Sequence, residues 1–165
     1  MPEHRLRAGA AAVNTTPSLG APINGGLGPG KAAHVHDELF AKGLVLEAGT
    51  NRLAFVVVDS CLIDREVFDA GKRLAQQHTG IPMEHILISC THTHSAGAVV
   101  GVHLCEPDPA YRAWLPAKLS DAIRRAVYNL APAEAGWGRG QVPQHVFCRR
   151  LLIKPGMTYT NQLGF

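Results

Sequence analysis

His85-Ile-Leu-Ile-Ser-Cys-Thr-His-Thr-His-Ser-Ala-Gly97 is the stretch around which the chain is organised. The apolar run at 86–88 predicts a short buried strand, which ends abruptly in small and polar residues. Successive side chains of an extended backbone point to opposite faces, so His92 and His94 would project the same way, about 7 Å apart. This spacing predicts that one metal ion is reached by both imidazoles.

The spacing of the two histidines is not specific by itself. The chain has nine histidines among 165 residues, for which chance alone gives roughly half a His-x-His motif. Two are present, because His34-Val-His36 repeats the pattern. A polar surface turn is the ordinary interpretation of either pair. The second pair, however, directly follows a buried strand, and ligands gather at the carboxyl edge of a parallel sheet.

Length and composition indicate one globular domain over residues 1–165. Apolar residues make up 46% and charged residues 18%, so the chain can build a core, and no apolar stretch is long enough for a transmembrane segment. The N-terminus lacks the apolar centre of a signal peptide, which predicts a cytoplasmic protein. The net charge of +3 is mild, and the arginine pairs at 124–125 and 149–150 are isolated, so we expect no nucleic-acid partner.

The four cysteines show no Cys-x-x-Cys spacing, which excludes a zinc knuckle or a thioredoxin-type motif. We expect them to be small core residues with free thiols, as is usual in a reducing compartment.

The hydrophobic pattern predicts an α/β fold, with a mixed, mostly parallel sheet and flanking helices. The expected strands are 5–13, 43–46, 53–58 and 86–89, the expected helices are 64–78 and 109–130, and the region 142–153 suggests one or two further strands. Residues 14–31 and 95–108 are predicted as loops. The glycines of the first loop form neither a dinucleotide fingerprint nor a phosphate-binding loop.

Strand 53–58, helix 64–78 and strand 86–89 form a predicted β-α-β unit. The strand at 53–58 is predicted to be a central strand buried on both faces, because its residues are apolar and largely β-branched. A right-handed crossover then places Asp59 and His92 at the same sheet edge. Asp59 could serve there as a metal ligand, as an anchor for a histidine, or as a helix N-cap.

Several segments together resemble the N-terminal part of the neutral/alkaline, non-lysosomal ceramidase family. The segments are Ala8-Gly-Ala-Ala-Ala-Val-Asn-Thr-Thr-Pro17, His36-Asp37, Phe55-Val-Val-Val-Asp59, Thr91-His-Thr-His-Ser95 and Phe147-Cys-Arg-Arg150. The resemblance runs nearly end to end. Two departures lie near the implied site: Ala96-Gly97 stands where the family has Gly-Pro, and Cys148 stands where it has asparagine.

The resemblance implies a zinc-dependent amidase that cleaves the N-acyl bond of ceramide, a related N-acyl lipid or another amide. In this family pattern His92 matches a zinc ligand, His94 a neighbouring catalytic histidine, and Arg149 an arginine that faces the substrate. His36 matches a histidine that lines the site. Zn²⁺ would polarise the amide carbonyl and lower the pKa of a bound water, and arginine would stabilise the developing oxyanion. We expect His36 and Asp59, or water, to complete the coordination of His92 and His94.

Family members are several times longer, and their remaining zinc ligands come from sequence beyond the matched stretch. The fold should therefore be incomplete relative to the family's catalytic domain, and we expect self-association or a partner chain that completes the site. The chain is then a fragment or incomplete form of an amidase, or alternatively a non-catalytic remnant that retains a metal-binding module. A Rossmann-like nucleotide-binding domain is a third alternative, disfavoured by the missing glycine fingerprint.

Overall fold

The computed structural model describes residues 5–102, 104–148, 150 and 152–157. It divides the chain into two units, Met1–Glu134 and Ala135–Phe165. The first unit holds almost all of the regular structure, and the described residues of the second hold one short 3₁₀ turn, η2 (Pro143–His145). The prediction of strands at 142–153 is wrong for the described residues of that region, which contain no strand. That one domain spans residues 1–165 stays a prediction.

The main sheet of the first unit has five strands in the order β6-β5-β4-β1-β8. The strands are β1 (Arg7–Asn14), β4 (Phe40–Ala48), β5 (Asn51–Val58), β6 (Ile86–Cys90) and β8 (Ala131–Pro132). Two helices accompany them, α1 (Arg65–Thr79) and α2 (Pro109–Tyr128). The predicted α/β class with a mixed sheet is confirmed, and each long strand and helix lies where the hydrophobic pattern placed it.

The balance of strand directions differs from the prediction. β5 and β6 are parallel, with Val58 opposite Cys90, whereas β4–β5, β1–β4 and β1–β8 are antiparallel. The physical reason is the length of the connections. A two-residue turn joins β4 to β5 and can only form a hairpin, whereas the α1 crossover between β5 and β6 permits parallel pairing.

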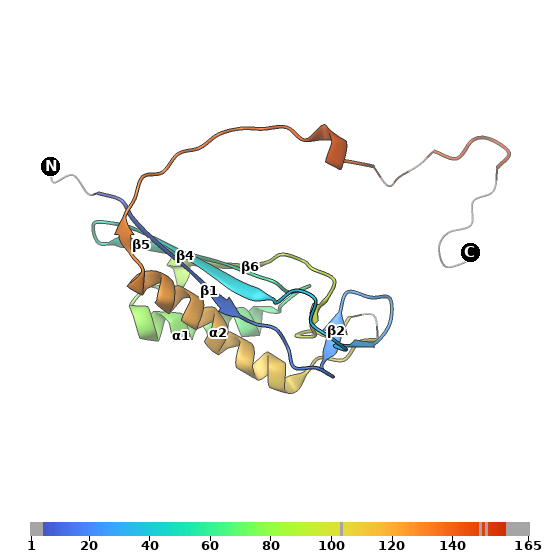
Figure 1. The fold of residues 1–165 in the computed structure, drawn as a ribbon, viewed down its shortest axis with the longest axis horizontal. Helices are drawn as coiled ribbons and strands as arrows, with labels where there is room; N and C mark the ends of the chain where they lie inside the picture. Colours follow the sequence, from blue (N-terminus) through green and yellow to red (C-terminus); the bar gives the residue numbers. More distant parts are fainter. Residues whose placement is uncertain (1–4, 103, 149, 151, 158–165) are drawn as a thin grey trace. The chain divides into compact units, whose positions relative to one another are not determined.

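Both helices lie on one face of the sheet (Figure 1). Asp64 caps the start of α1 by accepting a hydrogen bond from the Val67 amide, and Gly80 ends this helix at φ +72°. Asp108 caps α2 in the same way, and Pro109 occupies its first turn, where the missing amide hydrogen has no cost. α2 crosses β1 and β4 closely at Gly9 and Gly43, where a Cβ would collide with the helix backbone.

The opposite face of the sheet is apolar and partly exposed. Register aligns Ala10, Leu44, Phe55 and Leu87 in one row across four strands; the side chains of Leu44 and Leu87 are 39% and 58% exposed. The expectation that strand 53–58 is buried on both faces is wrong, because its side chains alternate between buried and exposed. The physical reason is that both helices cover the same face.

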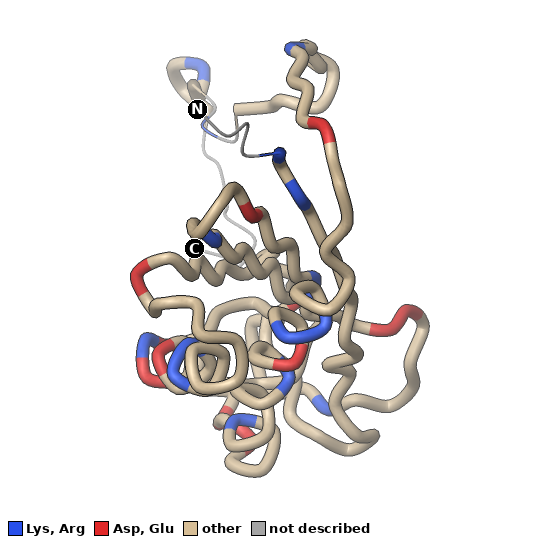
Figure 2. Tube along the Cα trace, turned by 90° about the vertical axis from the view of Figure 1, so that its left-hand side faces the viewer, with Lys and Arg blue, Asp and Glu red and all other residues tan. Residues whose placement is uncertain are grey.

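Charges of both signs are mixed along the helices, and several of them form ion pairs. Figure 2 shows blue and red segments interspersed along the trace, and α1 and α2 each carry ion pairs within one turn, such as Arg65–Asp69 and Arg124–Asp121. Of the helices that the structure describes, neither is both long enough and apolar enough to cross a bilayer.

A second, three-stranded sheet with the order β3-β2-β7 lies within segments predicted as loops. Its strands are β2 (Pro22–Asn24), β3 (Gly30–Lys31) and β7 (Ala96–Gly97). These strands have two or three residues, too few to show a hydrophobic period, which is why the sequence pattern did not reveal them. β2 pairs directly with β7, the segment that follows His94.

Candidate metal centre

The two histidines of the organising stretch lie in the turn after β6, not on extended backbone. His92 has φ +62°, a left-handed conformation that L-residues other than glycine adopt only rarely. This turn brings Nε2 of His92 to 3.4 Å from Nε2 of His94, with the two rings nearly perpendicular. The two imidazoles do lie together, but the expected extended backbone is wrong, since a turn rather than strand alternation brings them together.

The other ring nitrogen of His92 fixes its tautomer. Nδ1 lies 2.7 Å from the backbone carbonyl oxygen of Cys61. A carbonyl oxygen can only accept a hydrogen bond, so Nδ1 carries the hydrogen. In the neutral ring the lone pair therefore lies on Nε2, which faces His94. Histidines that bind metal commonly have this arrangement, because the hydrogen bond orients the ring and raises its basicity.

The separation of the two Nε2 atoms suits one tetrahedral ion. Nitrogen ligands bind Zn²⁺ at about 2.0–2.1 Å, so two of them on one tetrahedral ion lie about 3.3 Å apart. The structure has 3.4 Å. The described residues that could hold a metal ion together are Cys61, His92 and His94, whose ligand atoms lie within 4.8 Å of one another.

Cys61 was missed as a site residue by sequence reasoning. The sequence nonetheless contained a clue, since β5 and β6 are parallel neighbours and Cys61 follows the end of β5 just as His92 follows the end of β6. Its side chain is buried, and burial raises the pKa of the Cys61 thiol. Sγ lies 4.0 Å from Nδ1 of His92. A metal would have to displace the thiol proton.

The other cysteines are free as well. Cys105 is buried, as expected of a small core residue, whereas this expectation is wrong for Cys148, which is exposed. Cys90 is half-buried at the end of β6, and burial raises the pKa of its thiol to about 11. Its thiol is therefore protonated at neutral pH.

Asp59, a predicted metal ligand, has other partners in the structure. One carboxylate oxygen accepts a hydrogen bond of 3.0 Å from the Phe40 amide and lies 3.9 Å from Nζ of Lys42. Asp59 thus ties the end of β5 to the start of β4. Nor does it cap α1, because Asp64 does.

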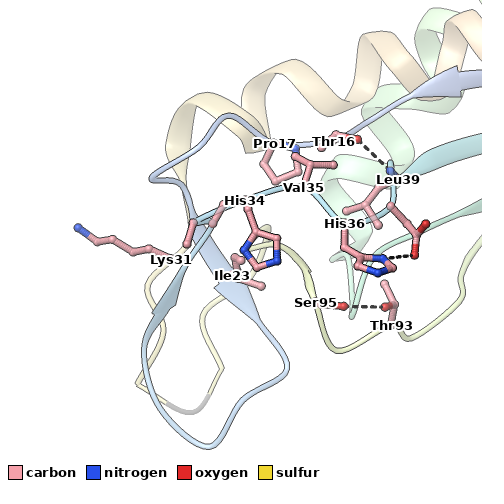
Figure 3. Close-up of a pocket in the computed structure, with 13 residues that line it drawn as sticks. Thr16, Pro17, Ile23, Lys31, His34, Val35, His36, Leu39, Thr93 and Ser95 are labelled. Carbon is pink, nitrogen blue, oxygen red and sulfur yellow. Dashed lines mark hydrogen bonds and ion pairs between the residues drawn. The ribbon is translucent and has the colours of Figure 1, made fainter.

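His36 lies on a pocket wall rather than in the histidine cluster. Its imidazole is exposed and its Nδ1 is 2.8 Å from a carboxylate oxygen of Asp37. The pocket of about 560 Å³ is bounded on one side by His34 and His36 and on another by Thr93 and Ser95. Figure 3 shows the His36 ring directed toward Thr93, whose hydroxyl is 3.5 Å from that of Ser95.

This pocket lies beside the histidine turn, because Thr93 and Ser95 alternate with His92 and His94 in sequence. Apolar side chains complete its wall, among them Pro17, Ile23, Val35 and Leu39. Arg149, the predicted substrate-facing arginine, lies outside the described residues.

Comparison with known proteins identifies the fold. Neither a family model nor a curated protein sequence matches the chain. A solved structure of neutral ceramidase from Pseudomonas aeruginosa is similar, with a TM-score of 0.66 and 22% identity over 79% of this chain and 22% of that chain. A ceramidase complexed with C2 gives a TM-score of 0.65 at the same identity and coverage. The chain thus spans about a fifth of the length of these ceramidases, and it has the fold of that part of a neutral ceramidase.

Proposed function

We propose that the chain forms the metal-binding part of a zinc-dependent amide hydrolase of the ceramidase type. The observation that carries the proposal is the pair of Nε2 atoms 3.4 Å apart, one of them in a ring oriented by the Cys61 carbonyl. The ceramidase fold supports the same reaction class, although a fold alone does not determine chemistry.

His92 and His94 would hold the ion through Nε2, and the Cys61 thiolate would be the third ligand. A set of three protein ligands with one open position is typical of catalytic rather than structural zinc sites. When bound, Zn²⁺ supplies Lewis acidity toward a carbonyl and lowers the pKa of water. Without metal, His94 donates its Nε2 hydrogen to the Nε2 lone pair of His92, so zinc competes with a hydrogen bond.

The adjacent pocket suits an N-acyl amide, and we propose an N-acyl lipid such as ceramide as the substrate class. Its wall combines apolar side chains such as Val35 and Leu39 with hydroxyl groups of Thr93 and Ser95. The apolar side chains would take the acyl chain, and the hydroxyls could hydrogen-bond to the amide group. Arg149 and His36 remain proposed contacts to this substrate.

Zinc binding is the first test of the proposal. We expect one zinc per chain with a micromolar or poorer dissociation constant in calorimetry, and at least a tenfold loss of affinity in His92→Ala. His145→Ala is the matched control, because His145 is exposed and lies in η2 of the other unit; it should bind zinc like the wild type. Equal zinc content in wild type and His92→Ala would refute the site.

Cys61→Ala and Cys148→Ser test the third ligand. Cys61→Ala keeps the backbone carbonyl that orients His92 but removes the thiol, so we expect about a tenfold weaker affinity for zinc. Cys148 is exposed, and its replacement should leave the affinity unchanged.

In the zinc-loaded chain, a short-chain N-acyl amide should shift the backbone amide resonances of Thr93 and Ser95; shifts confined to other regions would place the substrate elsewhere.

A further inference from the structure

Gly25 lies directly against the backbone of His94. A Cβ built on Gly25 would lie 2.2 Å from Cα of His94 and 2.4 Å from its carbonyl carbon and oxygen. Gly25 also has φ +118°, a conformation suited to glycine. Because the atoms it would meet belong to the backbone, no side-chain rotation can relieve the collision.

β2, which directly precedes Gly25, is bonded to the segment that follows His94. β2 pairs with β7 through Ile23 opposite Gly97 and Asn24 opposite Ala96, and the Ala98 amide donates to the Pro22 carbonyl at 2.9 Å. The Asn24 side chain is buried and donates a 2.8 Å hydrogen bond from Nδ2 to the Val100 carbonyl. Because these bonds tie β2 to the segment that follows His94, a side chain at residue 25 must change the position of the His94 backbone relative to β2.

We propose that Gly25 is a positioning residue for the metal pair: its missing side chain sets the backbone of His94 and thereby the separation of the two Nε2 atoms. The inference rests on the proposed metal site for its functional meaning. Two nitrogens share a tetrahedral ion only over a narrow range of separations. A shift of His94 by about 1 Å would take its Nε2 out of that range.

The experiment compares Gly25→Ala with Gly20→Ala. Gly20 has a positive φ of +88°, and nothing lies within 4 Å of a Cβ built there, so this control carries the backbone strain without the collision. We expect zinc affinity to fall at least tenfold in Gly25→Ala and to stay within twofold of wild type in Gly20→Ala. Both variants should keep the far-ultraviolet circular dichroism spectrum and a cooperative unfolding transition.

A double variant tests whether Gly25 acts through His94. In Gly25→Ala/His94→Ala, zinc affinity should equal that of His94→Ala alone, because residues acting through one contact are not additive. A further independent loss in the double variant would contradict the proposal. A Gly25→Ala chain without a cooperative unfolding transition would contradict it too, since Gly25 would then support the whole fold.

The metal-free chain supplies a readout that does not depend on zinc. Long-range ¹H–¹⁵N spectra report the tautomer and surroundings of each imidazole, and we expect the His94 ring resonances to move in Gly25→Ala but not in Gly20→Ala. If wild type binds no zinc, the proposed function fails while these spectra still test Gly25. If wild type binds zinc but Gly25→Ala matches Gly20→Ala in both affinity and spectra, the positioning role is refuted and the metal site stands.

Discussion

At the scale of single residues, the candidate site depends on the hydrogen bond from His92 Nδ1 to the Cys61 carbonyl. This bond joins the residues that follow β5 and β6. It also accompanies the left-handed conformation of His92, which costs of order 1 kcal/mol. Sparsely populated backbone conformations of this kind cluster at functional sites, in agreement with the proposed metal centre.

Asp64 stabilises the fold in two ways, so its replacement should cost more than the loss of an exposed ion pair. It caps α1 through the Val67 amide and pairs with Arg112 of α2. We expect Asp64→Ala to lower the free energy of unfolding by about 1–2 kcal/mol in urea titrations. Asp69→Ala removes a more exposed pair with Arg65 and should cost about 0.5 kcal/mol or less. Equal losses would show that the cap and the pair with Arg112 together stabilise the fold no more than an exposed ion pair.

The effect of Asp64 should also depend on pH. The hydrogen bond from Arg112 holds the pKa of the Asp64 carboxyl below its usual value of 3.8. A carboxyl whose pKa is lower in the folded state stabilises the fold above its unfolded pKa and loses this effect as pH falls. The stability gap between wild type and Asp64→Ala should therefore be constant from pH 5 to 7 and shrink below about pH 4.

At residue scale the sequence predicted the histidine pair but not its partners. His92 and His94 were found because their spacing and their place after a strand are local features. Cys61 and Gly25 act through contacts between segments more than thirty residues apart in sequence, and no local pattern encodes such a contact. Asp59 shows the converse. Its place at the strand end was predicted, but its carboxylate accepts a hydrogen bond from the Phe40 amide and pairs with Lys42.

At the scale of elements, α2 is the helix that packs directly on the main sheet. Its residues Leu115, Leu119 and Ile123 are fully buried, and it crosses β4 where Gly43 allows close approach. A Cβ on Gly43 would meet the carbonyl oxygen of Ala122 at 2.7 Å and its carbon at 2.9 Å. The helix backbone must therefore move if residue 43 gains a side chain.

We expect Gly43→Ala to destabilise the fold by about 1–3 kcal/mol. Gly28→Ala is the control, since nothing lies within 4 Å of a Cβ there, and it should change stability by less than about 0.5 kcal/mol. Urea unfolding followed by circular dichroism gives both values. A neutral Gly43→Ala would mean that α2 can shift across the sheet without cost.

Long elements were predictable because each carries several periods of its hydrophobic pattern. α1, β5 and β6 lie within about two residues of the predicted ranges. Strand direction was not predictable in the same way, since pairing of β1 with β4 depends on contacts between distant segments rather than on local pattern. The sequence predicts burial of both faces of β5, because Leu53 and Val57 are apolar. Both residues nevertheless lie on the exposed face.

At the scale of the whole molecule, the uncovered face of the main sheet is the feature with consequences for association. Leu44, Leu53, Val57 and Leu87 on this face are each between 39% and 58% exposed. Contiguous apolar surface of this kind favours association. We expect the wild-type chain to bind the dye ANS and to associate as concentration rises.

Leu87→Lys places a charge on this face at the edge strand β6, where charges discourage pairing. It should reduce ANS fluorescence and concentration-dependent association, measured by light scattering. Leu27→Lys is the matched control, because Leu27 is 71% exposed and lies outside the main sheet. Equal effects of the two substitutions would mean that the face has no special role.

The 165-residue chain alone should hydrolyse N-acyl amides poorly even when zinc is bound. The reason is that an ion bound at the proposed ligands Cys61, His92 and His94 would lie in an exposed position, because His92 and His94 are both open to water. Electrostatic stabilisation of a transition state is strongest where water is excluded. The chain also covers only 22% of the ceramidase structure to which it is similar.

Turnover of a fluorogenic N-acyl substrate by the purified monomer, with and without added zinc, measures this directly. We expect a rate close to that of free zinc at the same concentration, with no difference between wild type and Arg149→Ala. Zinc-dependent hydrolysis that is lost in both His92→Ala and Arg149→Ala would contradict the prediction. Those residues would then suffice for catalysis, and the open pocket beside Thr93 and Ser95 would be a working active site by itself.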